Sequence, residues 1–343
     1  MPTVKGSGII PSARPVSVPV VRGLFNEASP ASAEYAKADR FAPEVEMGAF
    51  GGEYVTDETW NAIDLSQTPS ALTPAAMAST DYEGLEIQLG SRSFEVGRYK
   101  LGKIDLPDYD VQRLRLENGI EMERFAANKL RARYDHTRYV LGAGALDTTS
   151  NYNGGTGTGS PVTLGSSTAN DLIGEMENVK DYFRDYQRDP EGEGMLIVVS
   201  GNLRGDLKRQ DQVRDAISAG AVSPDFSLKG YATDAALSRW FAEYWPGSEV
   251  LFLDGRMKNA AGTVVRPFGD PSATNGAIAF IRAAGGVQGR SFLKTAIASA
   301  ESRVNITRET VEAMPGQRLF GNALLEMHLA DPLSGYLWTG CAA

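Results

Sequence analysis

The hydrophobic positions between residues 195 and 281 follow a pattern of strands interrupted by helices. Short apolar runs rich in β-branched residues, typical of buried strands, cover Met195–Val199, Val250–Leu253 and Ala277–Ile281. A polar helix is predicted around Leu203–Ile217. A second helix opens at Thr233, a favourable N-cap, and ends at Pro246-Gly247. The stretch therefore predicts the order strand, helix, helix, strand, loop, strand.

The longest predicted helix covers residues 108–134, because Pro107 ends an extended segment and Asp108 is a good N-cap. Apolar residues recur at helical spacing on two sides. One side carries Val111, Leu114, Met122 and Phe125, and the other carries Leu116, Ile120, Ala127 and Tyr134. At ~1.5 Å per residue the helix would be roughly 40 Å long. Two apolar sides indicate a helix that lies between two layers.

Two further regions lack a core of their own. Residues 83–106 alternate apolar and polar positions, which predicts an antiparallel ribbon that turns at Gly90-Ser91. A two-stranded ribbon is marginal in water, so it needs a neighbour if it protrudes, although a hairpin packed on its own domain fits the pattern equally. Residues 1–40 contain five scattered prolines and predict an extended arm that becomes ordered along another surface.

The remaining elements are shorter. Residues 142–168 are rich in glycine and threonine and predict a loop. Ala169–Gln187 predicts a helix whose apolar face carries Leu172, Met176, Val179 and Phe183. Val304–Val311 and Leu319–His328 predict strands. A last strand follows the turn at Asp331-Pro332 and contains Gly335-Tyr336-Leu337.

Composition restricts the class of protein without naming it. The chain has 343 residues, of which 42% are hydrophobic and 22% charged, so it is globular with one large or two to three smaller domains. The net charge of −9 argues against nucleic-acid binding by overall charge. The first 26 residues carry three cations and no acid, which more often marks a solvated terminus than a phosphate site. No apolar run is long enough to cross a bilayer, and no signal peptide is recognisable, so assembly in a cytoplasm is expected.

Residues that carry chemistry are scarce. The two histidines, His136 and His328, and the single Cys341 exclude most histidine machinery, zinc clusters and an intrachain disulfide. No phosphate-binding glycine motif is present. Asp105, Asp108 and Asp110 form the tightest acidic group, which a helix start explains. The aromatic set Trp240, Phe241, Tyr244 and Trp245 indicates a core or a subunit contact. We therefore assign no catalytic, cofactor-binding or metal-binding residue and expect a protein that is not an enzyme.

The element order over 195–280, the long helix and the chain end around 331–337 resemble the major capsid (coat) proteins of tailed bacteriophages with the Hong Kong 97-type fold. The resemblance implies an α+β fold, with the last strand returning to the P-domain sheet. The implied divisions are an N-terminal arm (1–45), an extended β-hairpin loop (46–105), a P domain with a spine helix (106–165), an A domain (166–295) and return strands of the P domain (296–343).

The same resemblance implies the function. The protein would assemble into hexamers and pentamers of an icosahedral shell that encloses double-stranded DNA by weak, non-specific contact, as part of the virion. Scaffolding, portal and decoration proteins are the further expected partners, and deletion of residues 1–40 is expected to leave a soluble fold but block shell formation. The alternatives are an encapsulin-like compartment, another virion structural protein of the tail or a ring, and a soluble enzyme with a dispersed acidic site.

Overall fold

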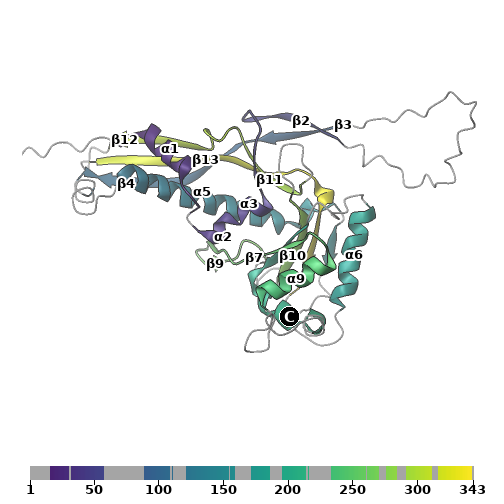
Figure 1. Ribbon diagram of the computed structural model, residues 1–343. Coiled ribbons are helices and arrows are strands. Elements are labelled where there is room, and N and C mark those ends of the chain that lie inside the picture. Colours follow the sequence, from purple (N-terminus) through teal and green to yellow (C-terminus); the bar gives the residue numbers. More distant parts are fainter. Residues whose placement is uncertain are drawn as a thin grey trace, which may run out of the picture.

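The computed structural model shows an elongated unit of sheet and helix beside a more compact unit in which helices cover a second sheet (Figure 1). The structure describes residues 16–30, 32–57, 89–108, 110, 121–153, 155–158, 171–185, 195–213, 215, 233–259, 261–269, 276–283, 291–310 and 316–341. The predicted Gly/Thr-rich loop at 142–168 is wrong in part, because residues 142–146 are helical, Thr149–Asn151 form a short 3-10 helix and Thr156–Thr158 form a strand; residues 154 and 159–168 lie outside the described part.

The elongated unit is a five-stranded sheet built around one long strand. Its strands are β1 (Glu44–Glu46), β4 (Gly97–Pro107), β11 (Leu293–Ile297), β12 (Val304–Thr310) and β13 (Gly316–Leu329). β13 pairs antiparallel with β4 along one edge and with β12 and then β11 along the other. β1 extends the sheet by pairing parallel with β11. The predicted strands at 304–311 and 319–328 are confirmed, whereas β11 was not predicted.

Helix α5 (Met122–Leu146) joins the two units. Its first half packs on the five-stranded sheet through residues such as Leu130 and Tyr134, and its second half packs on the other sheet through residues such as Ala143 and Leu146. The predicted end at residue 134 is therefore wrong, because burial against the second sheet carries the helix through Gly142 and Gly144. The helix contacts both sheets, but through its two halves and not through the two predicted apolar sides, because Met122 and Tyr134 lie in one core and Phe125 is exposed. The prediction of one unbroken helix over 108–134 is also wrong, since α5 begins at Met122 after the extended Glu121. Residues 111–120 lie outside the described residues.

The N-terminal segment departs from the expected extended arm. It forms α1 (Val18–Glu27), α2 (Ala33–Ala36) and α3 (Ala38–Phe41), all packed on the chain's own body. Pro19 is tolerated because it stands in the first helical turn, where its missing N–H has no intrahelical partner to lose. Val21 and Phe25 are fully buried on one side of α1. The expectation that this region takes its order only from neighbouring subunits is thus wrong for residues 16–46, and residues 1–15 lie outside the described part.

The compact unit contains the pattern predicted for 195–281. Its sheet has the order β5-β14-β10-β6-β7, with β5 (Thr156–Thr158), β6 (Met195–Ser200), β7 (Glu249–Leu253), β10 (Ala277–Arg282) and β14 (Gly335–Thr339). The helices are α6 (Leu172–Asp185), α7 (Arg204–Arg209) and α9 (Asp234–Tyr244), and Thr233 caps α9 by accepting the Ala236 N–H. α7 ends at residue 209 and Gln210 interrupts the helix predicted to run to 217, although residues 211–213 and 215 are helical again; residues 214 and 216–232 lie outside the described part.

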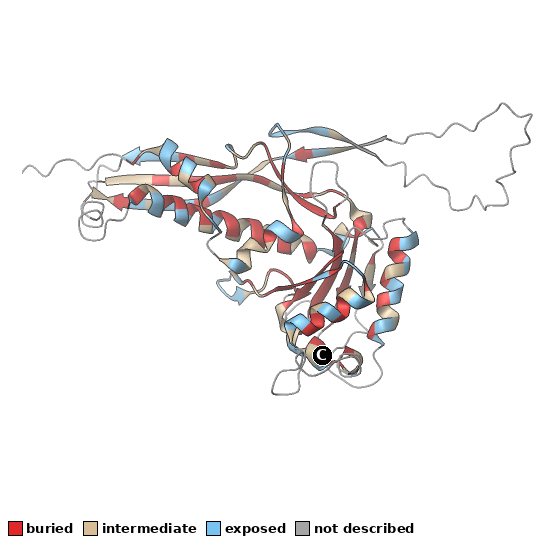
Figure 2. Cartoon of the chain, in the orientation of Figure 1, coloured by how far each residue is buried: buried red, intermediate tan, exposed pale blue. Residues whose placement is uncertain are grey.

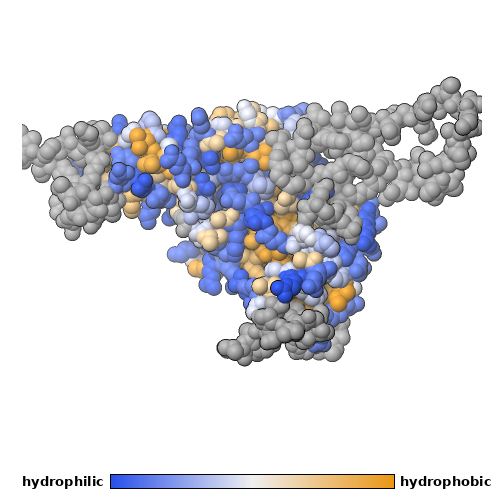
Figure 3. All heavy atoms as spheres, in the orientation of Figure 1, coloured by the Kyte–Doolittle hydropathy of each residue, from blue (hydrophilic) through white to orange (hydrophobic). Residues whose placement is uncertain are grey.

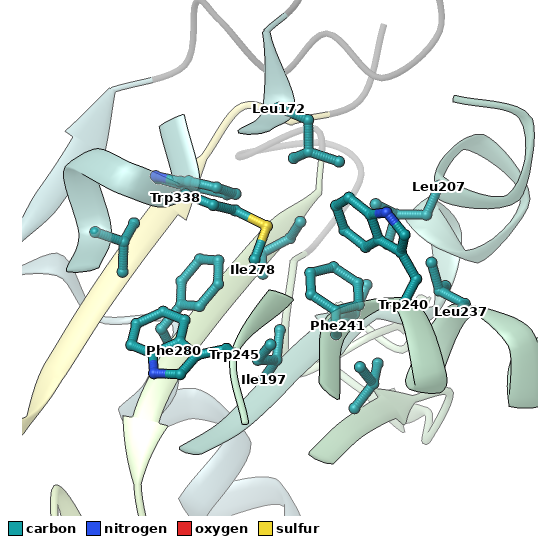
Figure 4. Packing of buried hydrophobic residues seen from close by; sticks show 14 of the residues in the cluster. Leu172, Ile197, Leu207, Leu237, Trp240, Phe241, Trp245, Ile278, Phe280 and Trp338 are labelled. Carbon is teal, nitrogen blue, oxygen red and sulfur yellow. The ribbon is translucent and has the colours of Figure 1, made fainter. Parts of the chain in front are cut away.

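This second sheet is buried on both faces (Figure 2), which explains why β6, β7 and β10 read as continuous apolar runs. One face packs under α6, α7 and α9, where Trp245 and Trp338 lie on either side of Phe280 (Figure 4). Trp240 and Phe241 belong to the same core, as the aromatic cluster predicted. The other face packs against the second half of α5 and against Phe41.

The predicted positions of the last strand and of Asp105 are both wrong. β14 lies in the compact unit between β5 and β10 and does not return to the five-stranded sheet. Its consecutive residues Leu337 and Trp338 are buried on opposite faces of the second sheet, which fixes it there. Asp105 does not start a helix, because it lies in β4 beside Arg318 of β13.

A two-stranded ribbon projects from the elongated unit (Figure 1). It pairs β2 (Gly51–Asp57) antiparallel with β3 (Leu89–Glu95), so Asp57 stands opposite Leu89. The predicted turn at Gly90-Ser91 is wrong, because both residues lie inside β3. β4 pairs with β13 and therefore belongs to the sheet. A small hairpin, β8 (Met257–Lys258) with β9 (Val264–Val265), follows β7.

Candidate functional site: the ribbon base, the N-terminal bridge and the outer surfaces

The residues examined for chemistry are dispersed through the fold. His136 lies inside α5, where its ring meets the Tyr35 ring edge-on, and His328 is buried on β13. Cys341 is buried in the core of the compact unit, where burial raises the pKa of its thiol to about 12. Among the described residues, no three His, Cys, Asp or Glu side chains gather in a group able to hold a metal ion. No helix in the described part is long and apolar enough to span a membrane.

The base of the ribbon is fixed to the five-stranded sheet by specific contacts. The Tyr54 hydroxyl of β2 is 2.6 Å from Nε2 of His328, and the Glu95 N–H of β3 donates to Glu326 Oε2 over 2.7 Å. Phe94 is buried at the same place, with 7% of its surface exposed. Because a ribbon alone is marginal in water, these contacts determine the direction in which it leaves the body.

The electrostatics of this base follow from burial. Burial, helped by the positive charges of Arg92 and Lys294, lowers the pKa of His328 to about 4, so its imidazole is neutral at pH 7. Burial also lowers the pKa of Lys294 to about 8, against an opposing effect of Asp331. The pKa of Glu326 is raised by burial. The base is therefore a partly dehydrated polar cluster whose charge changes both below pH 5 and near pH 8.

A second polar centre fastens the N-terminal segment to α5. The buried Arg138 donates through Nε to Thr295 Oγ1 over 3.0 Å and through Nη2 to the Ala42 carbonyl over 2.7 Å. Its Nη1 group pairs with Asp39 and, over 3.1 Å, with Glu44 Oε1. One guanidinium thus joins α3, β1 and β11 to the long helix.

The same segment also reaches the compact unit. Glu34 Oε1 accepts hydrogen bonds from the Tyr139 hydroxyl over 2.8 Å and from the N–H groups of Asp254 and Gly255 over 2.7 and 3.0 Å. Burial opposes ionisation of Glu34, but hydrogen bonds from Lys37 and Tyr139 outweigh it and leave the pKa below its usual value. Lys37 Nζ in turn donates to the Phe252 carbonyl over 2.6 Å. We call residues 32–46 the N-terminal bridge, because they link the long helix, the sheet and the compact unit.

The outer surface is hydrophilic, with apolar positions gathered in small separate patches on the face shown in Figure 3. Among the described residues, Val20 on α1 and Phe50 before the ribbon are about half exposed, at 49% and 55%. Phe50 lies directly before β2, at the root of the projecting ribbon. The features that stand out among the described residues are therefore the ribbon and its base.

No family model matches the sequence, and no curated protein matches it significantly. In three dimensions the chain is similar to a phage-related protein from Bordetella bronchiseptica RB50, with a TM-score of 0.66 and 13% identity over 96% of this chain and 98% of that one. It is also similar to the capsid of a native GTA particle, with a TM-score of 0.55 and 13% identity over 92% and 93% of the two chains. The capsid of the cyanophage P-SCSP1u gives a TM-score of 0.52 and 9% identity over 89% and 88%.

These likenesses extend over nearly the whole length of both chains in each pair. They show that the chain has the α+β fold of phage capsid proteins of the Hong Kong 97 type, which confirms the fold expected from the order of its elements.

Proposed function

We propose that this protein is a major capsid protein that assembles into an icosahedral shell around double-stranded DNA and so becomes part of a virion. The observation that carries the proposal is the match of 92% of the chain to the capsid of the native GTA particle, together with the 89% match to the cyanophage capsid. A match over about nine-tenths of the chain is too long to come from a small common substructure.

The arrangement of the chain supports self-assembly. In this proposal the compact unit is the A domain, the sheet with α5 is the P domain, and the ribbon lies over an adjacent copy. A ribbon that projects from the body, with Phe50 exposed at its root, gains buried surface only from another molecule. Hexamers and pentamers of the chain, with scaffolding, portal and decoration proteins, complete the proposed set of partners.

Electron microscopy of the purified full-length protein tests the proposal. We expect closed shells, and nuclease-protected double-stranded DNA in particles taken from an infected host. Tubes or rings would indicate another virion structural protein, and shells that hold protein in place of DNA would indicate an encapsulin-like compartment. A protein that remains in small particles under all assembly conditions would overturn the proposal.

The ribbon offers a matched variant. Since Asp57 faces Leu89, residues 58–88 can be replaced by an Asn-Gly turn that closes the hairpin without altering its register. We expect the shortened chain to fold with unchanged stability but to form no closed shells. Normal shells from this variant would show that the removed segment has no part in assembly, while leaving the capsid function standing.

A further inference from the structure

The side of α5 that faces away from the five-stranded sheet carries an unusual group of charges. Lys129 and Arg133 are exposed one helical turn apart, and Arg256 and Lys258 are exposed on the neighbouring β8–β9 hairpin. Figure 1 shows β9 beyond α5 on the side away from β12 and β13. We call these four residues the basic strip.

An open groove of about 550 Å³ lies between the hairpin and the helix. It is lined by Arg133, His136, Thr137, Val140, Leu141, Arg256, Met257, Lys258 and Val264. His136 Nε2 lies 3.4 Å from the Arg256 carbonyl oxygen, at the point where the hairpin meets the helix. The aliphatic side chains of both elements line the groove between the cations. The cations therefore lie on or directly next to regular secondary structure, α5 and β8.

No carboxylate lines this groove. The acids nearest in sequence are engaged elsewhere, since Asp135 is buried in an ion pair with Arg131 and Asp254 pairs with Arg204 over 3.0 Å. Among the described residues, no carboxylate lies within ion-pair distance of the basic strip. Like charges at i and i+4, as in Lys129 and Arg133, destabilise a helix slightly. A cluster of unneutralised cations in a chain of net charge −9 therefore fits a polyanionic ligand.

The two sides of the elongated unit have different surroundings. The ribbon leaves from the side of the sheet away from α5 (Figure 1). In a closed shell every copy turns the same side outward, so contacts made by ribbons stay on the sheet side. The α5 side is then available to the contents of the shell.

We propose that the basic strip contacts the phosphate backbone of double-stranded DNA inside the shell, without reading its sequence. The inference rests on the proposed function and extends it by assigning the residues that meet the DNA. Contact by Lys and Arg with phosphates releases counterions, so binding through the strip weakens steeply as salt rises. An acidic protein segment is the competing ligand for the same charges.

The experiment compares two variants that each lose three positive charges. The strip variant is Lys129→Gln, Arg133→Gln and Lys258→Gln. The control variant is Arg98→Gln, Lys100→Gln and Lys103→Gln, whose exposed side chains lie on β4, on the face of the sheet away from α5. Binding of the unassembled full-length chain to a 30-base-pair duplex is measured by fluorescence anisotropy over a range of salt concentrations.

We expect the strip variant to bind the duplex at least tenfold more weakly at low salt. The slope of log K against log salt should fall by up to about 3, because each lost phosphate contact removes about 0.9. The control variant should bind like the parent. Equal binding by the parent and the strip variant would overturn the inference, and so would a strip variant that binds DNA normally but no longer forms shells, because that result identifies a contact with protein. Absence of shells from the parent chain would instead count against the proposed function.

Discussion

The Tyr54 hydroxyl lies 2.6 Å from Nε2 of His328, although the two residues are separated by 274 positions in the sequence. Their rings meet edge-on, with centroids 5.5 Å apart. Tyr54 belongs to the ribbon and His328 to the central strand β13, so this hydrogen bond connects the projecting ribbon to the five-stranded sheet. The direction of the ribbon depends on a contact between two side chains that single substitutions can remove.

Replacement of Tyr54 by phenylalanine should loosen the ribbon without unfolding the body. The hydrogen bond to His328 is lost while the ring contact remains, which should cost about 1 kcal/mol. Hydrogen exchange of backbone amides in residues 51–57 and 89–95 should become faster, while exchange in β6 and β10 should not change. Tyr99→Phe removes the same hydroxyl from β4 and serves as the control. Unchanged exchange in the ribbon of Tyr54→Phe would show that other contacts hold its base.

The stability of the folded chain should fall as the pH is lowered through the window between 6.5 and about 4. Burial beside Arg92 and Lys294 lowers the pKa of His328 from 6.5 to about 4. Within this window the unfolded chain binds a proton that the folded chain does not, so acidification favours unfolding. The contribution of His328 is complete above pH 6.5 and amounts to at most about 3 kcal/mol.

The measurement is the urea midpoint of the parent and of His328→Gln between pH 4 and pH 8. The parent should lose more stability than the variant as the pH falls, because carboxyl groups elsewhere titrate equally in both proteins. Parallel curves for the two proteins would show that His328 does not titrate differently in the folded and unfolded states.

The compact unit was predictable because its sequence pattern and its environment agree. A sheet covered on both faces needs continuous apolar strands, and Met195–Ser200 and Ala277–Arg282 are buried at every position. The N-cap at Thr233 and the apolar face of α6 were equally visible. Here local signals alone determine the elements, so the order of strands and helices could be derived from the sequence.

The N-terminal region was mispredicted because its structure depends on distant partners. Pro19 signals a break in the chain, yet it lies in the first turn of α1. Phe25 is buried against residues that are distant in sequence, such as Tyr134. The end of α5 was misplaced for the same reason, since glycine 142 weakens a helix locally but faces Phe41 closely in the fold. Tertiary packing outweighs local propensity at both places.

The functional surfaces were predicted less well than the fold. The sequence indicated a ribbon but not its partners, since the pairing of Asp57 with Leu89 spans 31 intervening residues. His328 was correctly placed on the predicted strand Leu319–His328, but nothing near it in sequence indicated Tyr54. The basic strip combines one face of α5 with a hairpin more than a hundred residues later, so its charges could not be recognised as a group before the fold was known.

Removal of the buried Arg138 guanidinium should destabilise the chain far more than removal of an exposed one. Arg138→Met removes the cation that joins Glu44, Thr295 and the Ala42 carbonyl in a buried setting, although Glu44 keeps the Tyr134 hydroxyl and the Ala42 carbonyl keeps the Thr295 hydroxyl as donors; the loss should cost about 3 kcal/mol of unfolding free energy. Arg40→Met removes an ion pair between Arg40 and Glu249 that is largely exposed, and should cost less than about 1 kcal/mol.

Urea unfolding of both variants measures the difference. The two arginines lie on or against the same N-terminal bridge and undergo the same substitution, so burial is the main variable between them. Equal losses for Arg138→Met and Arg40→Met would show that the bridge is not fastened through Arg138.

Truncation of the N-terminus should separate two parts of the region that was expected to be a single arm. A chain that begins at residue 16 keeps Val16, Val21 and Phe25 in the core and should unfold at the parent's urea concentration. A chain that begins at residue 28 exposes the surface that α1 covers on α5 and β12, and should lose several kcal/mol of unfolding free energy.

Phe25→Ala reproduces part of that loss, about 3 to 5 kcal/mol, because the fully buried ring packs edge-on against Tyr134. The exposed Val20→Ala is the control on the same helix and should change stability by less than about 0.5 kcal/mol. If the chain beginning at residue 28 unfolds like the parent, α1 contributes nothing to the isolated subunit, and the original expectation of an arm ordered only by its neighbours would be restored.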